Sequence, residues 1–195
     1  MKKRKELNIK SLTVEQIENE LKREKYKSRY IKMFINTISA LIIIFAISTL
    51  IATFITPLLE VSETTMKPSI NNGDYVVAVK TQNLKRGDIV AFYHGNKILI
   101  KRVIALEGDW INIDEKGNVY LNNKQLKEDY ILNKSSGDYT TDFPYQVPNN
   151  KYFVLNDERD IVIDSRNKDI DSIDKNTIIG KVVFRIWPFK KIGKL

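Results

Sequence analysis

The stretch Ile-Ser-Ala-Leu-Ile-Ile-Ile-Phe-Ala-Ile-Ser-Thr-Leu-Ile-Ala-Thr-Phe-Ile at residues 38–55 decides how this chain is organised. It is the centre of a run from Met33 to Leu59 that holds no charged side chain. A helix of about 20 apolar residues spans the hydrocarbon core of a bilayer. We therefore expect residues 33–56 to form a transmembrane anchor.

Two other structures fit an apolar run near the N-terminus, a cleaved secretory signal and a buried helix of a soluble protein. A secretory signal has a shorter apolar core and small residues at its cleavage site. The sequence that follows the run, Thr56-Pro57-Leu58-Leu59-Glu60, contains no such site. The residues therefore favour an uncleaved anchor.

The positive charge of the chain is concentrated ahead of the anchor. Residues 1–32 hold eleven Lys and Arg against five Asp and Glu, whereas residues 57–195 hold 21 against 19. Because cytoplasmic flanks carry the excess of basic residues, we expect residues 1–32 in the cytoplasm and residues 57–195 outside. The charges of residues 57–195 are nearly balanced, and this segment lacks the basic patch of a nucleic-acid-binding protein. The partner expected from the anchor is the lipid bilayer, and no nucleic acid is expected.

Thr13 and Gln16 are spaced like a capping box and predict a short helix through Leu21.

The composition argues against several kinds of active site. The 195 residues include no cysteine and one histidine, so disulfides, thiolate nucleophiles and imidazole-rich zinc sites are not expected. A group of acidic residues lacks the glycine and the spacing of a calcium-binding loop; its members are Asp157, Glu158, Asp160 and Asp164. We expect neither a metal ion nor another cofactor.

Beyond Pro57 the pattern changes to short runs of β-branched residues separated by Gly-Asp and Asn-Asn pairs, which is typical of strands and hairpins. The length leaves room for one globular domain, so residues 57–195 are expected to form a single, mainly β, partly barrel-like domain. The stretch 133–150 is expected to be a long loop. The predicted strands are Tyr75–Val79, Ile89–Phe92, Ile98–Leu106, Trp110–Ile113, Val119–Leu121, Tyr152–Leu155 and Ile178–Ile186.

One charged residue stands inside the most apolar of these strands. Alternation along the strand puts Lys101 on the same face as Leu99 and Val103. Burial among aliphatic side chains lowers the pKa of a lysine, and a neutral lysine is a possible general base. The alternative is that Lys101 lies at a sheet edge and its ammonium group extends into solvent.

Several hydroxyl groups follow directly after the anchor. The sequence Val61-Ser62-Glu63-Thr64-Thr65-Met66-Lys67-Pro68-Ser69-Ile70 is followed by Gly73-Asp74. A nearby base activates such a hydroxyl as a nucleophile.

These segments together resemble the type I signal peptidases, the membrane-bound serine/lysine peptidases. Residues 65–70 match the family pattern S-M-x-P-[TS]-[LI] apart from the first residue, and residues 100–104 with Gly108-Asp109 match the block that carries the family's base. Residues 152–160 and 164–166, with Gly180-Lys181, match its third block. The resemblance extends over about residues 32 to 188.

The resemblance implies a β-rich catalytic domain that removes N-terminal signal peptides from exported proteins. It places the nucleophile at Thr65 and the general base at Lys101, with the substrate bound as an added β-strand. It also implies two structural ion pairs, Arg102 with Asp157 and Asp164 with Arg166; the alternative for these four residues is unrelated surface charge.

The chain departs from the family pattern near both catalytic positions. Thr65 stands where the family has serine, and its additional methyl group stiffens χ1 and crowds the approach to a carbonyl. Glu63 stands near the expected oxyanion, where a carboxylate opposes developing negative charge unless it points to solvent. Glu158 replaces an asparagine, and Val162 replaces a serine expected to hydrogen-bond Lys101.

Two alternatives follow from these departures. The first is a weakly active or inactive relative that binds exported pilins and assists pilus assembly; Phe143-Pro144-Tyr145 and Asn156-Asp157 resemble that subgroup of Gram-positive proteins, while the retained Lys101 argues against it. The second, a self-cleaving repressor with the same chemistry, needs a cytoplasmic DNA-binding domain, which the anchor and the charge distribution disfavour.

Overall fold

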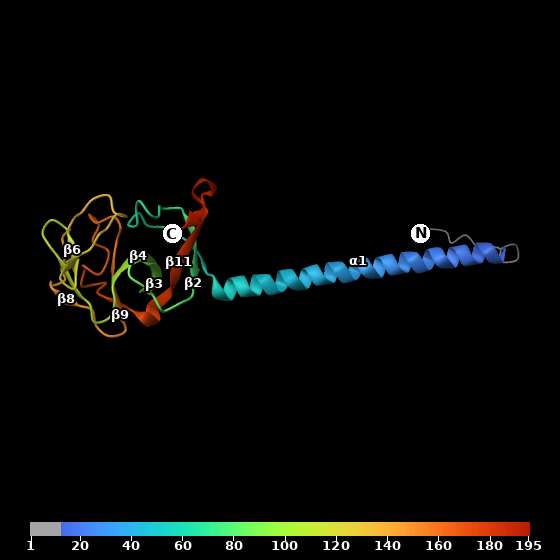
Figure 1. Ribbon diagram of the computed structural model, residues 1–195, viewed down its shortest axis with the longest axis horizontal. Coiled ribbons are helices and arrows are strands. Elements are labelled where there is room, and N and C mark those ends of the chain that lie inside the picture. Colours follow the sequence, from blue (N-terminus) through green and yellow to red (C-terminus); the bar gives the residue numbers. More distant parts are fainter. Residues whose placement is uncertain (1–12) are drawn as a thin grey trace. The chain divides into compact units, whose positions relative to one another are not determined.

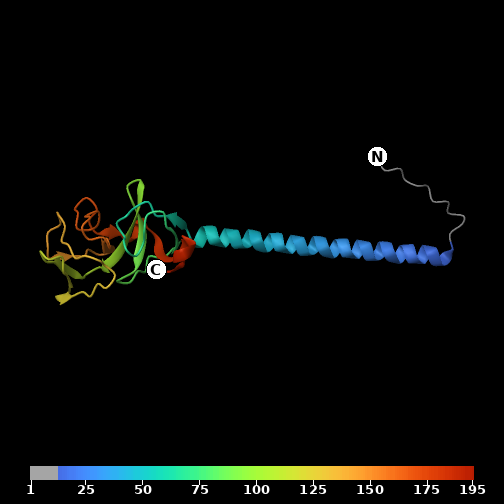
Figure 2. The same ribbon diagram turned by 90° about the horizontal axis from the view of Figure 1, so that it is seen from above.

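The computed structural model describes residues 13–195, without the side chains of residues 51–55. It divides into two compact units, a first that ends at Ile51 and a second that comprises Ala52–Leu195. The described part of the first is helical, and the regular structure of the second, beyond the end of that helix, is mainly strands, with short 3-10 helices at Lys175–Thr177 and Phe189–Lys191 (Figures 1 and 2). The prediction of a mainly β fold after one N-terminal helix is confirmed.

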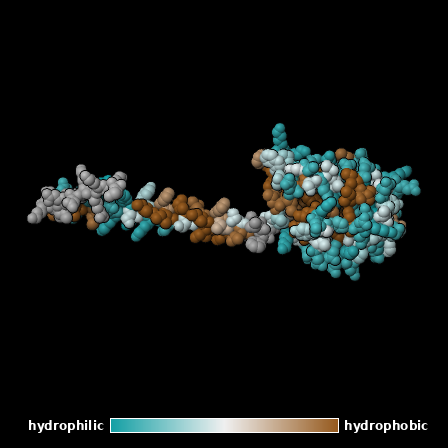
Figure 3. Space-filling model, turned by 180° about the vertical axis from the view of Figure 1, so that it is seen from behind, coloured by the Kyte–Doolittle hydropathy of each residue, from teal (hydrophilic) through white to brown (hydrophobic). Residues whose placement is uncertain are grey.

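Helix α1 (Val14–Ile55) begins where the sequence indicates, because the backbone N–H of Thr13 donates to Gln16 Oε1 at 3.2 Å. The helix then continues unbroken through the apolar run, so the prediction of a separate short helix ending near Leu21 is wrong. No glycine or proline lies within α1, and those are the residues that most strongly break helices. Among the described residues this is the one helix long and apolar enough to cross a membrane, and Figure 3 shows apolar residues along much of it.

The larger sheet of the second unit is antiparallel and open, with the strand order β1-β2-β11-β3-β4-β9-β10 and with β12 paired to β11. Figure 1 shows β2 and β11 at one end of this unit, and β6 and β8, which belong to a second sheet, at the other. The strands of the larger sheet are β1 (Leu58–Glu60), β2 (Tyr75–Val79), β3 (Ile89–His94), β4 (Lys97–Ala105), β9 (Lys151–Leu155), β10 (Ile173–Asp174), β11 (Ile178–Trp187) and β12 (Gly193–Lys194).

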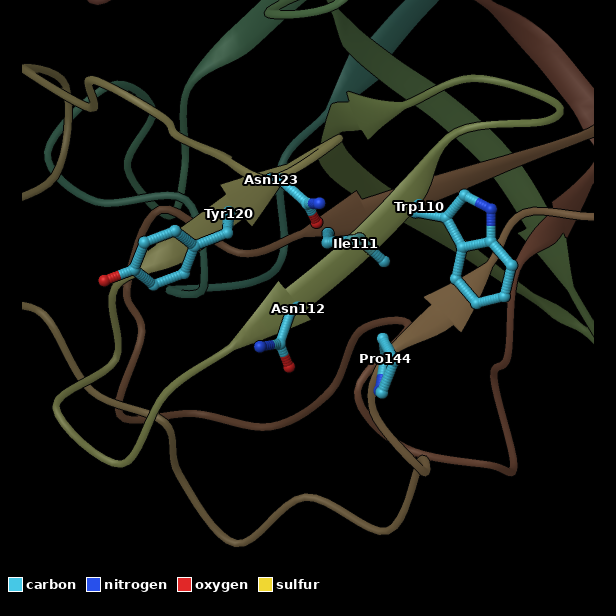
Figure 4. Close-up of a pocket in the computed structure, with 6 residues that line it drawn as sticks. All are labelled: Trp110, Ile111, Asn112, Tyr120, Asn123 and Pro144. Atoms are coloured by element: carbon cyan, nitrogen blue, oxygen red, sulfur yellow. The ribbon is translucent and has the colours of Figure 1, made fainter.

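The smaller sheet has the order β7-β6-β5-β8. The predicted loop 133–150 contributes to it only the two-residue strand β8. Its strands are β5 (Trp110–Ile113), β6 (Val119–Leu121), β7 (Lys124–Gln125) and β8 (Tyr145–Gln146). A pocket of about 330 Å³ lies at this sheet (Figure 4), lined by Trp110, Ile111, Asn112, Tyr120, Asn123 and Pro144.

Strand β4 is fixed from several directions because its apolar residues enter three separate core clusters. Ile100 packs with the cluster around β2, Leu99 and Val103 pack with the cluster that contains β3, and Ile104 packs with residues of β5 and β9. Its neighbours in the sheet are β3 and β9. A side chain on the middle of β4 is therefore held in a rigid and dry setting.

Candidate active site

Thr65 lies in a turn over residues 64–70 that follows β1. Met66 and Ile70 anchor this turn in the core, each at most 1% exposed, and the N–H of Ile70 donates to the carbonyl of Met66 at 2.8 Å. The backbone N–H of Glu158 donates to the carbonyl of Thr65 at 2.9 Å. The backbone that carries the Thr65 hydroxyl is thus held by hydrogen bonds and by two buried side chains.

Lys101 lies in the middle of β4 and is 0% exposed. Because β3 and β9 flank the strand, the interpretation of Lys101 as a solvated lysine at a sheet edge is wrong. The Nζ atom donates to Thr65 Oγ1 at 2.9 Å, across 36 positions of the sequence. The structure therefore brings the two residues predicted to be catalytic into hydrogen-bond contact.

Glu63 is the third member of this arrangement. Its Oε2 atom accepts a hydrogen bond from Lys101 Nζ at 2.7 Å and another from Thr65 Oγ1 at 3.0 Å. The side chain of Glu63 is 26% exposed, yet its carboxylate turns inward to the other two residues. The possibility that it points away to solvent is therefore wrong, since a buried ammonium group attracts it.

The electrostatic surroundings of Lys101 act in two directions. Burial lowers the pKa of Lys101, while the hydrogen bond and charge of Glu63 and the charge of Asp164 raise it. Burial is the larger influence, and the pKa stays below the usual value of a lysine. Losing a proton is thereby made easier for Lys101 than for a solvated lysine.

Two buried ion pairs surround the three residues. Arg102 donates to Asp157 from Nε at 2.8 Å and from Nη2 at 2.6 Å. Arg166 donates to Asp164 from Nε at 2.9 Å and from Nη2 at 2.8 Å. Asp157, Asp164 and Arg166 are each at most 1% exposed and Arg102 is 9% exposed, so these four residues are not unrelated surface charges.

The other two departures from the family pattern are Glu158 and Val162. Glu158 contributes its backbone N–H to the turn of Thr65. Val162 lies against the backbone of Gly137, where an added Cβ would be 2.3 Å from Val162 Cγ2. The side chain of valine has no hydrogen-bonding group, so it cannot bond Lys101 as the expected serine would.

Sequence reasoning missed a third buried ion pair, between Arg159 and Glu128. Arg159 donates to Glu128 from Nη2, and both side chains are 1% exposed. The ring of Tyr130 lies under Arg102, with 4.1 Å between the guanidinium carbon and the ring centroid. Glu128 and Tyr130 precede Arg159 by about thirty positions and carry no local pattern, so no sequence signal indicated these contacts.

Comparisons with known proteins show the family to which the chain belongs. The model of the family described as "Signal peptidase, peptidase S26" matches residues 34–187. Signal peptidase IB of Staphylococcus aureus (strain COL) is 33% identical over 181 residues, covering 82% of this chain and 93% of the relative. Signal peptidase I of Bacillus licheniformis is 34% identical over 170 residues, covering 80% and 90%.

A crystal structure of a signal peptidase I from Enterococcus faecalis V583 is also similar, with 28% identity and a TM-score of 0.43, and it covers 52% of this chain and 98% of its own. The apolar helix α1 and the matching family indicate a single-pass membrane protein. By the extent of the match to the family model and to its curated relatives, this chain belongs to the signal peptidase family, peptidase S26.

Proposed function

We propose that the chain is a membrane-anchored endopeptidase that removes N-terminal signal peptides from exported proteins, with Thr65 as nucleophile and Lys101 as general base. The observation that supports these roles is the 2.9 Å hydrogen bond between Lys101 Nζ and Thr65 Oγ1, formed by a lysine that is 0% exposed. A buried amine next to a hydroxyl is the arrangement that a lysine-activated nucleophile requires.

The reaction begins when neutral Lys101 takes the proton of the Thr65 hydroxyl and Oγ1 attacks the carbonyl carbon of the scissile peptide bond. The C–N bond then breaks, and the ammonium group of Lys101 gives its proton to the leaving amine. The acyl group is left as an ester on Thr65. Lys101 next takes a proton from a water molecule that attacks this ester, and returns it to Oγ1 as the ester breaks.

The proposed topology places residues 1–32 in the cytoplasm, 33–56 in the membrane and 57–195 outside. Its support is the charge bias, because basic residues precede the apolar run while Glu60 and Glu63 follow it. A peptidase on the outer side of the membrane meets signal peptides where they leave the bilayer. The partners are then the lipid bilayer and exported proteins that carry signal peptides.

A cleavage assay with full-length protein in detergent and a signal-bearing precursor tests the two catalytic roles. We expect Thr65→Ala and Lys101→Met to abolish cleavage. Thr64→Ala and Lys97→Met are matched controls, because both residues are exposed neighbours on the same segments, and they should cleave as wild type does. The proposed roles of Thr65 and Lys101 are contradicted if either active-site variant retains wild-type activity. They are also contradicted if the wild-type protein is inert and Thr65→Ser cleaves.

A second candidate function is suggested by the contacts of Glu63. A carboxylate bonded to both Lys101 and Thr65 favours the charged form of the lysine and opposes its action as a base. This contact favours a weakly active or inactive relative that binds exported pilins and assists pilus assembly. Such a protein would bind a pilin precursor without cutting it, and Lys101→Ala would keep its function. Loss of pilus assembly in a Lys101→Ala strain would contradict this candidate.

A further inference from the structure

The side chains of Glu63, Thr65 and Lys101 differ sharply in their access to water. Lys101 is 0% exposed and Thr65 is 4% exposed, whereas the side chain of Glu63 is 26% exposed. The hydrogen bonds of Lys101 Nζ go to the other two members of the group. Glu63 is thus the most exposed member of the group and is bonded to the buried lysine.

We propose that the charge of Glu63 sets the pH at which Lys101 becomes a base, and that Glu63 also passes the released proton to solvent. This inference rests on the proposed function of Lys101. The proton moves along the 2.7 Å hydrogen bond from Nζ to Oε2, so that an ammonium and a carboxylate become an amine and a carboxylic acid. The acid then releases the proton to water, and the pair has lost one proton overall.

The other charged groups near Lys101 do not have the position that this role needs. Asp164 also acts on Lys101 through its charge, but it is 0% exposed and accepts hydrogen bonds from Arg166 and from the backbone N–H of Asn156. Arg102, the next residue on β4, donates instead to Asp157. Glu63 is the carboxylate that is both bonded to Lys101 and partly exposed.

The influences on Lys101 determine whether its pKa rises or falls when Glu63 is replaced. Burial favours the neutral amine, whereas the carboxylate of Glu63 favours the ammonium. Glu63→Gln keeps the size and one acceptor oxygen but removes the charge. Lys101 should then lose its proton at a lower pH, by about one to three pH units, the usual effect of a close opposite charge.

The pH dependence of kcat/KM for precursor cleavage by the full chain tests this inference. We expect the acid limb of the Glu63→Gln profile to lie at lower pH than that of wild type, and the limb of Glu63→Asp to stay nearer to wild type because the charge is kept. Glu60→Gln is the matched control, since Glu60 lies three residues earlier and acts on Tyr75. A Glu63→Gln limb that is unmoved, or that moves to higher pH, would overturn the inference.

A titration of Lys101 by NMR separates this inference from the proposed function. Full-length protein with ¹³C-labelled lysine in micelles gives the Cε shift of Lys101, assigned by its loss in Lys101→Met. A lower titration midpoint in Glu63→Gln supports the role of Glu63 even if no variant cleaves a precursor. The absence of cleavage would contradict only the proposed peptidase function. Equal midpoints in wild type and Glu63→Gln overturn the role of Glu63 even if cleavage is found.

Discussion

Arg102 and Asp157 form a two-pronged buried ion pair that joins the two halves of the candidate site. Arg102 follows Lys101 on β4, and Asp157 precedes Glu158, whose N–H holds the carbonyl of Thr65. The hydroxyl of Ser69, in the same turn as Thr65, donates to Asp157 as well. Arg102, next to Lys101, is thereby linked through residues 157 and 158 to the turn that carries Thr65, and these contacts support the distance between Lys101 and Thr65.

Removing the arginine of this pair should lower the stability of the fold and, with it, the cleavage activity. Arg102→Met leaves the carboxylate of Asp157 buried without its cation, which typically costs about 3–5 kcal/mol of unfolding free energy, and we expect precursor cleavage to fall with it. Thermal unfolding of the full chain in detergent measures the first effect. Lys151→Met is the control, because its pair with Asp171 is partly exposed and should contribute less than about 1 kcal/mol. Equal losses in the two variants would refute the role of Arg102.

The methyl group of Thr65 is expected to limit the rate of cleavage. Thr65→Ser keeps the hydroxyl that contacts Lys101 and Glu63 and removes the crowding and the χ1 restriction of a β-branched residue. We expect kcat to rise about tenfold, which corresponds to ~1.4 kcal/mol of activation free energy. Initial rates on one precursor measure it, with Thr64→Ser as control. A slower serine variant would show that the methyl group instead holds the hydroxyl in its reactive position.

The sequence predicted the long strands of the fold well and the short ones poorly. All seven predicted strands are present with bounds that differ by at most two residues. Six of them have four or more residues and show alternation or a β-branched run, and the three-residue β6 is marked by the turns on either side of it. Strands such as β1, β7 and β10 have two or three residues and no periodicity to recognise. Their pairing depends on neighbours that are distant in the sequence.

The residues of the candidate site could be predicted from the sequence, but the contacts among them could not. Alternation along β4 gave the face of Lys101, whereas its complete burial depends on β3 and β9, and β9 begins about fifty residues later. Glu63 was recognised as a departure, yet nothing in a single sequence states which way a carboxylate turns. That direction is set by the ammonium group of Lys101, which only the folded sheet brings to 2.7 Å.

Close packing at Gly180 should make β11 intolerant of any side chain there. A Cβ at this position would lie 2.5 Å from the carbonyl oxygen of Val79 on β2 and 2.9 Å from its carbonyl carbon, and backbone atoms in a paired strand do not yield. Gly180→Ala is expected to lower the unfolding free energy by about 1–3 kcal/mol. Gly193→Ala, with open space around the added Cβ, should leave the unfolding temperature unchanged. Equal unfolding temperatures for the two variants would contradict this packing argument.

Asp109 connects the end of β4 to the smaller sheet through a set of hydrogen bonds. It accepts from Arg86 Nε and Nη2 at 2.7 to 3.0 Å, from the N–H of Leu106 at 2.8 Å and from Asn122 Nδ2 at 2.8 Å. Burial raises the pKa of Asp109, but these donors outweigh it and hold the pKa below the usual value of an aspartic acid.

The depressed pKa of Asp109 predicts a stability contribution that depends on pH. A carboxyl group whose pKa is lower in the folded than in the unfolded chain stabilises the fold above its unfolded pKa and loses this effect as pH falls through the folded value. Asp109→Asn should therefore lower the unfolding free energy by about 2 kcal/mol at pH 7. The difference from wild type should shrink below about pH 4, the unfolded pKa of aspartate. Asp142→Asn is the control, because its carboxylate is 93% exposed. Thermal unfolding of both variants from pH 3 to 7 measures the effect, and a loss for Asp109→Asn that is constant across this range would mean that its charge contributes nothing.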